Sequence, residues 1–138
     1  VVLLFLAAWG NDTLAYCTGM LIGKHKMSPI LSPKKSIEGL VGGIVGAAIL
    51  GALYGLYLNT YIRFSFNPVT MFPVICGLGG AVSVIGDLAA SAIKRDSGIK
   101  DYGTLIPGHG GILDRFDSII FIAPVIYYLT VMISGGAI

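Results

Sequence analysis

The residues whose types and spacing could do chemistry are concentrated between Ser91 and Asp117. Lysine and arginine in this stretch can hold phosphate oxygens, and glycines beside His109 let backbone N–H groups approach an anion. Asp114 and Asp117 are three positions apart, so on a helix they project together as oxygen ligands for a hard cation such as Mg²⁺. Basic residues alone would fit a lipid-headgroup anchor equally well. The paired aspartates and the Gly-His-Gly-Gly run indicate phosphate chemistry instead.

Two further carboxylates, Asp12 and Asp87, lie inside long apolar runs, where an ionised group is costly and usually marks function. Asp87, Ser91, Lys94 and Arg95 follow i, i+4, i+7, i+8 spacing, which places them on one face of a helix. A buried ion pair or a helix–helix hydrogen bond is the structural alternative for Asp87. For Asp12, a hydrogen-bonded packing role is as good an explanation as a functional one.

The elements that must position these residues are apolar helices. Of the 138 residues, 55% are hydrophobic and 12% are charged, with a mean hydropathy of +0.85, whereas soluble domains carry about a quarter charged residues. A net charge of +2 is too small to indicate nucleic-acid binding. We therefore expect an all-α, polytopic membrane bundle of about four transmembrane helices. The expected spans are about Val1–Ile22, Ile37–Leu58, Val69–Ile93 and Phe116–Ser134.

The segments between these spans differ in charge. Gly23–Ser36 and Lys94–Arg115 each carry four Lys or Arg residues, and Asn59–Pro68 carries only Arg63. Because Lys/Arg-rich loops stay cytoplasmic, we expect the first and third loops on the cytosolic side. The active site would then face the cytosol from an inner or plasma membrane.

The second span contains pairs of glycines four residues apart, which let helix backbones approach closely. The pairs are Gly39 with Gly43, Gly42 with Gly46, and Gly51 with Gly55. We assign these glycines to packing.

The stretch from Ser91 to Asp117 resembles the signature of the phosphatidate cytidylyltransferases, also called CDP-diacylglycerol synthases, and meets every specified position of it. Trp9 to Lys24 and Ser32 to Gly39 are also similar to that family. The resemblance covers nearly the whole chain. It implies that residues 1–138 form a single membrane-embedded catalytic domain from the C-terminal part of a longer protein, without the family's usual N-terminal spans.

The resemblance implies transfer of a cytidylyl group from CTP to phosphatidic acid within a lipid bilayer, with Mg²⁺ as cofactor. A second cation and a homodimer remain open. The implied metal ligands are Asp87, Asp114 and Asp117. The implied catalytic residues are these three together with Lys94, Arg95 and His109, and the implied substrate-binding residues are Ser91, Lys100, Asp101, Gly110, Gly111 and Arg115.

Two alternatives differ in chemistry. A CTP-dependent lipid kinase, of the dolichol or phytol type, would move the γ-phosphoryl group and leave no nucleotide on the lipid. An ion-coupled transporter would use Asp12 and Asp87 to line an ion path. Against the transporter, such a path does not need the Gly-His-Gly-Gly cluster, and the sequence has no visible internal repeat.

Overall fold

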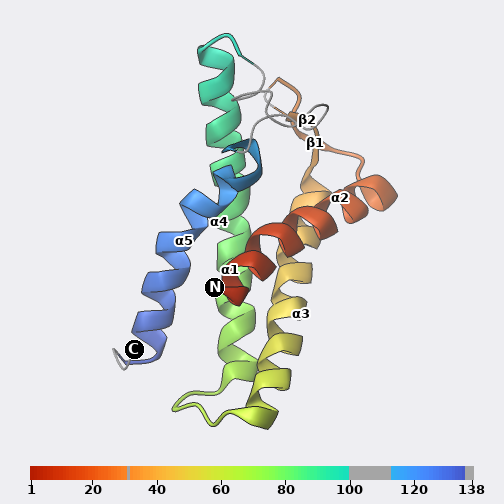
Figure 1. Ribbon diagram of the computed structural model, residues 1–138. Coiled ribbons are helices and arrows are strands. Elements are labelled where there is room, and N and C mark those ends of the chain that lie inside the picture. The colour runs from red at the N-terminus through yellow and green to blue at the C-terminus, as the bar shows by residue number, and fades with distance from the viewer. Residues whose placement is uncertain (31, 100–112, 136–138) are drawn as a thin grey trace.

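The computed structural model describes residues 1–30, 32–99 and 113–135, and it is mostly helical (Figure 1). The first helical segment is made of α1 (Val2–Phe5), the π-helical η1 (Leu6–Gly10) and α2 (Asn11–Ile22), which follow one another without a gap. The remaining elements are β1 (Lys26–Ser28), β2 (Ser32–Ser36), α3 (Ile37–Tyr61), α4 (Pro68–Asp96) and α5 (Leu113–Ile133).

Helices α3 and α4 form the long axis of the molecule and lie side by side in opposite directions (Figure 1). Each begins with a side-chain cap. The Ser36 hydroxyl accepts a hydrogen bond from the Gly39 backbone N–H at 3.1 Å, and the Asn67 side chain accepts one from Val69 at 3.1 Å. Both helices are long and apolar enough to cross a membrane. They confirm the helices expected at Ile37–Leu58 and Val69–Ile93.

The first helical segment differs from a simple span. It runs obliquely across the other helices (Figure 1), with α2 packed on α3 and η1 packed on α3, α4 and α5. In α5, the apolar part is the shorter Ser118–Ile133. The four expected spans therefore correspond to helical segments. Within the described ranges, however, only α3 and α4 have the length and composition of membrane-crossing helices.

The all-α expectation was wrong for the segment Gly23–Ser36, which contains an antiparallel hairpin of β1 and β2. Lys26 pairs with Ser36, and Ser28 pairs with Ser32, with an irregularity in register between them. The hairpin is too short and too polar to produce the alternating apolar pattern by which strands are predicted.

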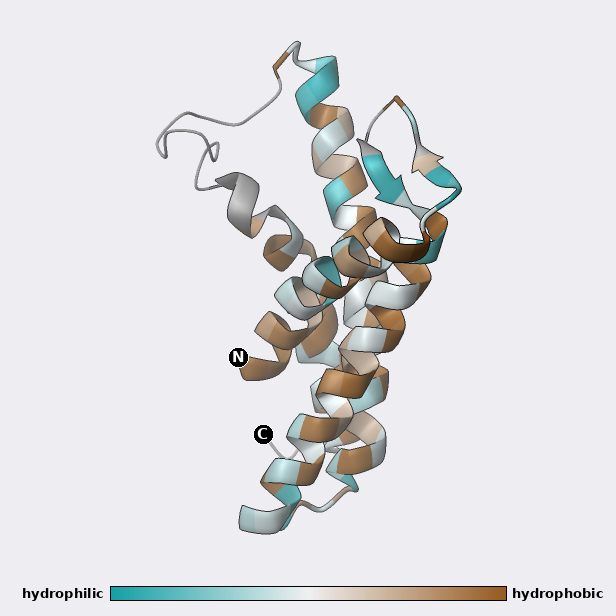
Figure 2. Cartoon of the chain, turned by 90° about the vertical axis from the view of Figure 1, so that its right-hand side faces the viewer, coloured by the Kyte–Doolittle hydropathy of each residue, from teal (hydrophilic) through white to brown (hydrophobic). Residues whose placement is uncertain are grey.

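The hairpin and the C-terminal end of α4 lie close together in the fold. Figure 2 shows hydrophilic residues on the hairpin and on the last turn of α4, which lie at the same end of the molecule. The connection between α3 and α4 lies at the opposite end (Figure 1). The hairpin and the end of α4 thus share one side, as the charge pattern of the loops predicted.

Four of the glycines of α3, namely Gly39, Gly43, Gly51 and Gly55, are buried at close helix contacts. A Cβ atom added to Gly39 would lie 2.7 Å from the Ala15 carbonyl oxygen of α2. One added to Gly51 would lie 2.7 Å from the Phe72 carbonyl oxygen of α4, and one added to Gly55 would lie 2.5 Å from that of Pro68. Since real Cβ atoms do not come so close, the packing role predicted for these glycines is confirmed.

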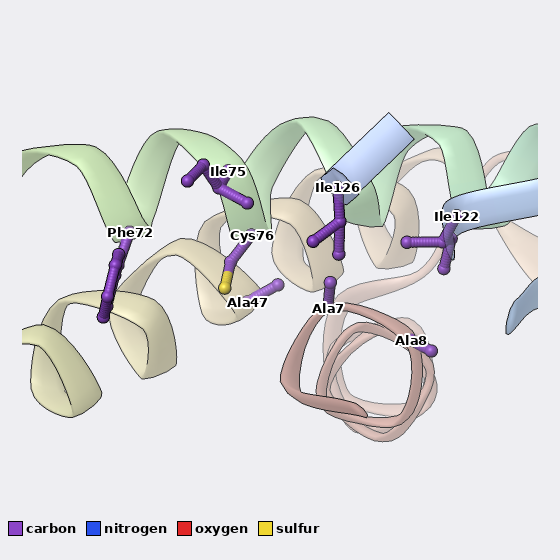
Figure 3. Packing of buried hydrophobic residues seen from close by; sticks show 8 residues of the cluster. All are labelled: Ala7, Ala8, Ala47, Phe72, Ile75, Cys76, Ile122 and Ile126. Atoms are coloured by element: carbon purple, nitrogen blue, oxygen red, sulfur yellow. The ribbon is translucent and has the colours of Figure 1, made fainter. Parts of the chain in front are cut away.

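The apolar core lies where the first segment, α3, α4 and α5 meet (Figure 3). Small side chains from the first segment and α3 face larger ones from α4 and α5, and all are buried. The cluster comprises Ala7, Ala8, Ala47, Phe72, Ile75, Cys76, Ile122 and Ile126. The alanines let η1 lie close to α3 and α4, which fixes the position of α2 beyond it.

These contacts predict opposite effects for two Gly→Ala substitutions. Gly51→Ala should destabilise the protein by about 1–3 kcal/mol, because the new methyl group meets backbone and Cys76 with no room to shift. Gly77→Ala is the matched control in α4, since its Cβ would meet Ala48 at an ordinary 3.7 Å, and the better helix propensity of alanine is worth up to about 1 kcal/mol. Thermal unfolding in detergent, followed by circular dichroism, measures both. A Gly51→Ala protein as stable as the control would contradict the close packing.

Candidate functional site

A cavity of about 300 Å³ lies among α2, the hairpin, α3 and α4. It collects charged residues from three separate elements: Asp12 from α2, Lys34 and Lys35 from β2, and Asp87 from α4. The rest of its lining is Asn11, Ala15, Tyr16, Met27, Ser36, Gly39, Leu40 and Val84. Two carboxylates and two ammonium groups therefore line one space.

Asp87 is in an ion pair within this cavity. The Lys35 ammonium group donates a hydrogen bond to Asp87 Oδ2 at 2.6 Å, joining positions that are 52 residues apart. The side chains are 31% and 16% exposed, respectively, so the pair is shielded more than a surface ion pair. An ion pair of the kind considered as the structural alternative for Asp87 is thus present, and the metal-binding role of Asp87 stays a prediction. Lys35 was not among the predicted site residues, because its charge was interpreted only as a sign of topology.

Asn11 is a second cavity residue that the sequence analysis missed. Its side chain is fully buried, and within the described part of the chain neither its Oδ1 nor its Nδ2 atom has a hydrogen-bond partner. The same holds for the buried hydroxyl of Ser83, one turn before Asp87 on α4. Leaving a buried amide unpaired is costly, and the Asn11 Oδ1 atom faces Gly43 of α3 and Gly80 of α4 at the helix interface. The available signal was a polar residue inside an apolar run, but only Asp12 was interpreted in that way.

Four of the predicted residues lie along α4, which is continuous to Asp96. Asp87 lines the cavity, Ser91 and Lys94 are half-buried, and Arg95 is exposed. Lys94 and Arg95 are in the last turn of the helix, where positive charge is favoured by the helix dipole. The helix therefore runs from the cavity to a basic end, as the spacing predicted.

The other predicted site residues cannot be placed at the cavity. Lys100, Asp101, His109, Gly110 and Gly111 lie outside the described residues. Asp114, Arg115 and Asp117 belong to the first turns of α5, and only the backbone of these three residues is described. In the described ranges, no three His, Cys, Asp or Glu side chains come close enough to hold a metal ion. A metal site shared by Asp87, Asp114 and Asp117 stays a prediction.

The hairpin is held at its base by His25 and Glu38. The Glu38 carboxylate lies 2.6 Å from His25 Nδ1 and accepts hydrogen bonds from the His25 backbone N–H at 3.2 and 3.3 Å. The Ile37 N–H donates to the His25 carbonyl oxygen at 2.9 Å. The start of α3 therefore fixes where the hairpin, and with it Lys35, can lie.

A second hollow, of about 420 Å³, adjoins the cavity and is lined by lysines. Lys34 and Lys35 line both spaces, and Lys24 and Lys26 line only the outer one. Positive charge thus continues from the cavity to the outer face of the hairpin.

Fold and site together define a helical protein with helices of membrane-crossing length and a cavity where carboxylates meet lysines. The model of the cytidylyltransferase family matches residues 1–133, and the chain belongs to this family.

Curated relatives bear the name phosphatidate cytidylyltransferase. The protein of Staphylococcus saprophyticus is 39% identical over 129 residues, which are 94% of this chain and 48% of that protein. The protein of Staphylococcus aureus strain COL is 42% identical over 129 residues, which cover 92% of this chain and 47% of that protein. The chain spans about half the length of the curated relatives it matches.

The contacts at the hairpin base predict that Glu38→Ala loosens the hairpin without unfolding the helices. Loss of the acceptor for His25 should raise amide hydrogen exchange at Lys26 and Ser36 by about fivefold, since one net hydrogen bond is worth about 1 kcal/mol. Glu38→Gln keeps an acceptor oxygen and serves as the control, with a smaller effect. Unchanged exchange in Glu38→Ala would show that the hairpin does not depend on this contact.

Proposed function

We propose that this protein transfers a cytidylyl group from CTP to phosphatidic acid, forming CDP-diacylglycerol and pyrophosphate for phospholipid synthesis. The structural observation that carries the proposal is the cavity in which lysines of the hairpin meet Asp87 of α4. Membership of the cytidylyltransferase family and relatives named phosphatidate cytidylyltransferase support it.

The reaction joins two polyanions. A phosphate oxygen of phosphatidic acid attacks the α-phosphorus of CTP, the bond from that phosphorus to the bridging oxygen breaks, and pyrophosphate leaves. Such a transfer depends on positioning and on neutralising charge. Lys34 and Lys35 would supply positive charge from the hairpin, and Lys94 and Arg95 from the end of α4. His109, Arg115 and Lys100 would add phosphate contacts.

We propose that Mg²⁺ is held by Asp87 together with Asp114 and Asp117. Asp87 fits this role because its carboxylate lines the cavity that it shares with the carboxylate residue Asp12. When bound, Mg²⁺ polarises the α-phosphate and steadies the leaving pyrophosphate. Ser91, Asp101, Gly110 and Gly111 would contact the substrates around this centre.

The protein is proposed to lie in the membrane, with α3 and α4 crossing it. Val41, Val45, Ile49 and Leu53 form a stripe along α3, and each is between 53% and 58% exposed. A continuous apolar stripe is unfavourable in water and suits lipid tails. The hairpin and the end of α4 would face the cytosol, where CTP is available.

The function predicts which phosphate of CTP enters lipid. The intact protein in detergent, given phosphatidic acid, Mg²⁺ and CTP labelled at the α-phosphate, should produce labelled lipid, and CTP labelled at the γ-phosphate should not. Reactions without phosphatidic acid are the control. Label from the γ-phosphate would mean a lipid kinase. No labelled lipid from either nucleotide would contradict both and favour a non-enzymatic role.

The orientation predicts different labelling of two introduced cysteines in a protein whose Cys17 and Cys76 are replaced by alanine. Ser65→Cys, in the exposed connection between α3 and α4, should react with an impermeant thiol reagent in intact cells. Lys26→Cys, exposed on the hairpin, should react only after the membrane is permeabilised. The reverse pattern would overturn the orientation.

A further inference from the structure

The ion pair at Asp87 competes with the role that the proposed function gives to this carboxylate. Asp87 Oδ2 is engaged by Lys35 at 2.6 Å, and a carboxylate neutralised by an ammonium group attracts a divalent cation weakly. We propose that Lys35 and the divalent cation exchange at Asp87: the ammonium group occupies the carboxylate first, and it is released to bind a substrate phosphate when the cation arrives. This inference rests on the proposed function.

The geometry indicates which partner moves. Asp87 is attached to the long, packed helix α4 by a short side chain and is 16% exposed. Lys35 belongs to a short hairpin strand, is 31% exposed, and lines both the cavity and the outer hollow. Its flexible four-carbon stem can turn the ammonium group from Asp87 into either space without a change in the backbone.

The charges of the cavity favour a joint exchange. Its described lining carries Asp12 and Asp87 against Lys34 and Lys35, a formal charge of zero. A divalent cation raises this charge to +2, and a phosphate group then restores the balance. Cation and phosphate should therefore bind together more strongly than either binds alone.

The experiment measures Mn²⁺ binding to the purified intact protein in detergent, without nucleotide, by electron paramagnetic resonance. Lys35→Met keeps an unbranched apolar stem and removes the charge, so it should tighten Mn²⁺ binding by about five- to tenfold, because no competitor remains at Asp87. Asp87→Asn should weaken binding by more than that factor. Lys26→Ala is the matched control: it removes the same charge from the same hairpin, but from a residue outside the cavity lining, and it should change the affinity by less than about twofold.

Steady-state kinetics test the second step of the exchange, in which the released Lys35 binds a substrate phosphate. Lys35→Met should raise the KM for CTP or for phosphatidic acid by about tenfold, as loss of a charged hydrogen bond does. Mn²⁺ affinity that is unchanged or weaker in Lys35→Met, or no Mn²⁺ binding in any variant, would overturn the exchange. So would unchanged KM values for both substrates. If Lys35→Met does not fold, Lys35→Gln is measured with the same expectations.

The binding measurement requires no turnover, so the two proposals fail separately. Tighter Mn²⁺ binding in Lys35→Met without labelled lipid from CTP would contradict the proposed function and leave cation competition at Asp87 standing. Labelled lipid from the α-phosphate with unchanged Mn²⁺ affinity would contradict only the exchange.

Discussion

The close approach of α3 to its neighbours is the constraint on which the rest of the structure depends. Glycines on α3 admit the backbone of α2 at one end and that of α4 at the other. Gly43 faces Asn11, and Gly39 faces Ala15, so α2 lies close enough for Asp12 to share a cavity with Asp87. Larger residues at these positions would separate the helices and, with them, the two carboxylates. The packing of the apolar helices thus determines the arrangement of the polar site.

The hairpin supplies positive charge that apolar helices cannot easily carry. The proposed site for two polyanions needs several positive charges, and lysines are expensive within helices that would cross a membrane. The chain places Lys26, Lys34 and Lys35 on a short polar hairpin at one end, anchored through His25 and Glu38 to the first turn of α3. From there, Lys35 reaches inward to Asp87 on α4. Lys34 and Lys35 therefore stay near water while they line a cavity whose other residues come mainly from α2, α3 and α4.

The sequence was informative where a local pattern determines the structure. Apolar length predicted α3 and α4, glycine spacing predicted close helix packing, and a carboxylate in an apolar run marked Asp87. The hairpin, the oblique first segment and the partner of Asp87 depend on contacts between residues far apart in the chain. The pair of Lys35 and Asp87 spans 52 positions, and no local pattern connects them. Asn11 was overlooked for a related reason, since its isolation became visible only once α3 and α4 surrounded it.

Asp87 shows how burial can serve function. A carboxylate that is 16% exposed loses much of its hydration, so a positive partner is needed to offset this loss. An ammonium group and a divalent cation can each be this partner, and the low exposure of Asp87 strengthens its attraction to either one. In the proposed exchange, the carboxylate always has a positive partner, because one replaces the other. The released lysine is then beside the anion that the new cation attracts, so the charge that stabilises the empty site becomes a substrate contact in the filled one.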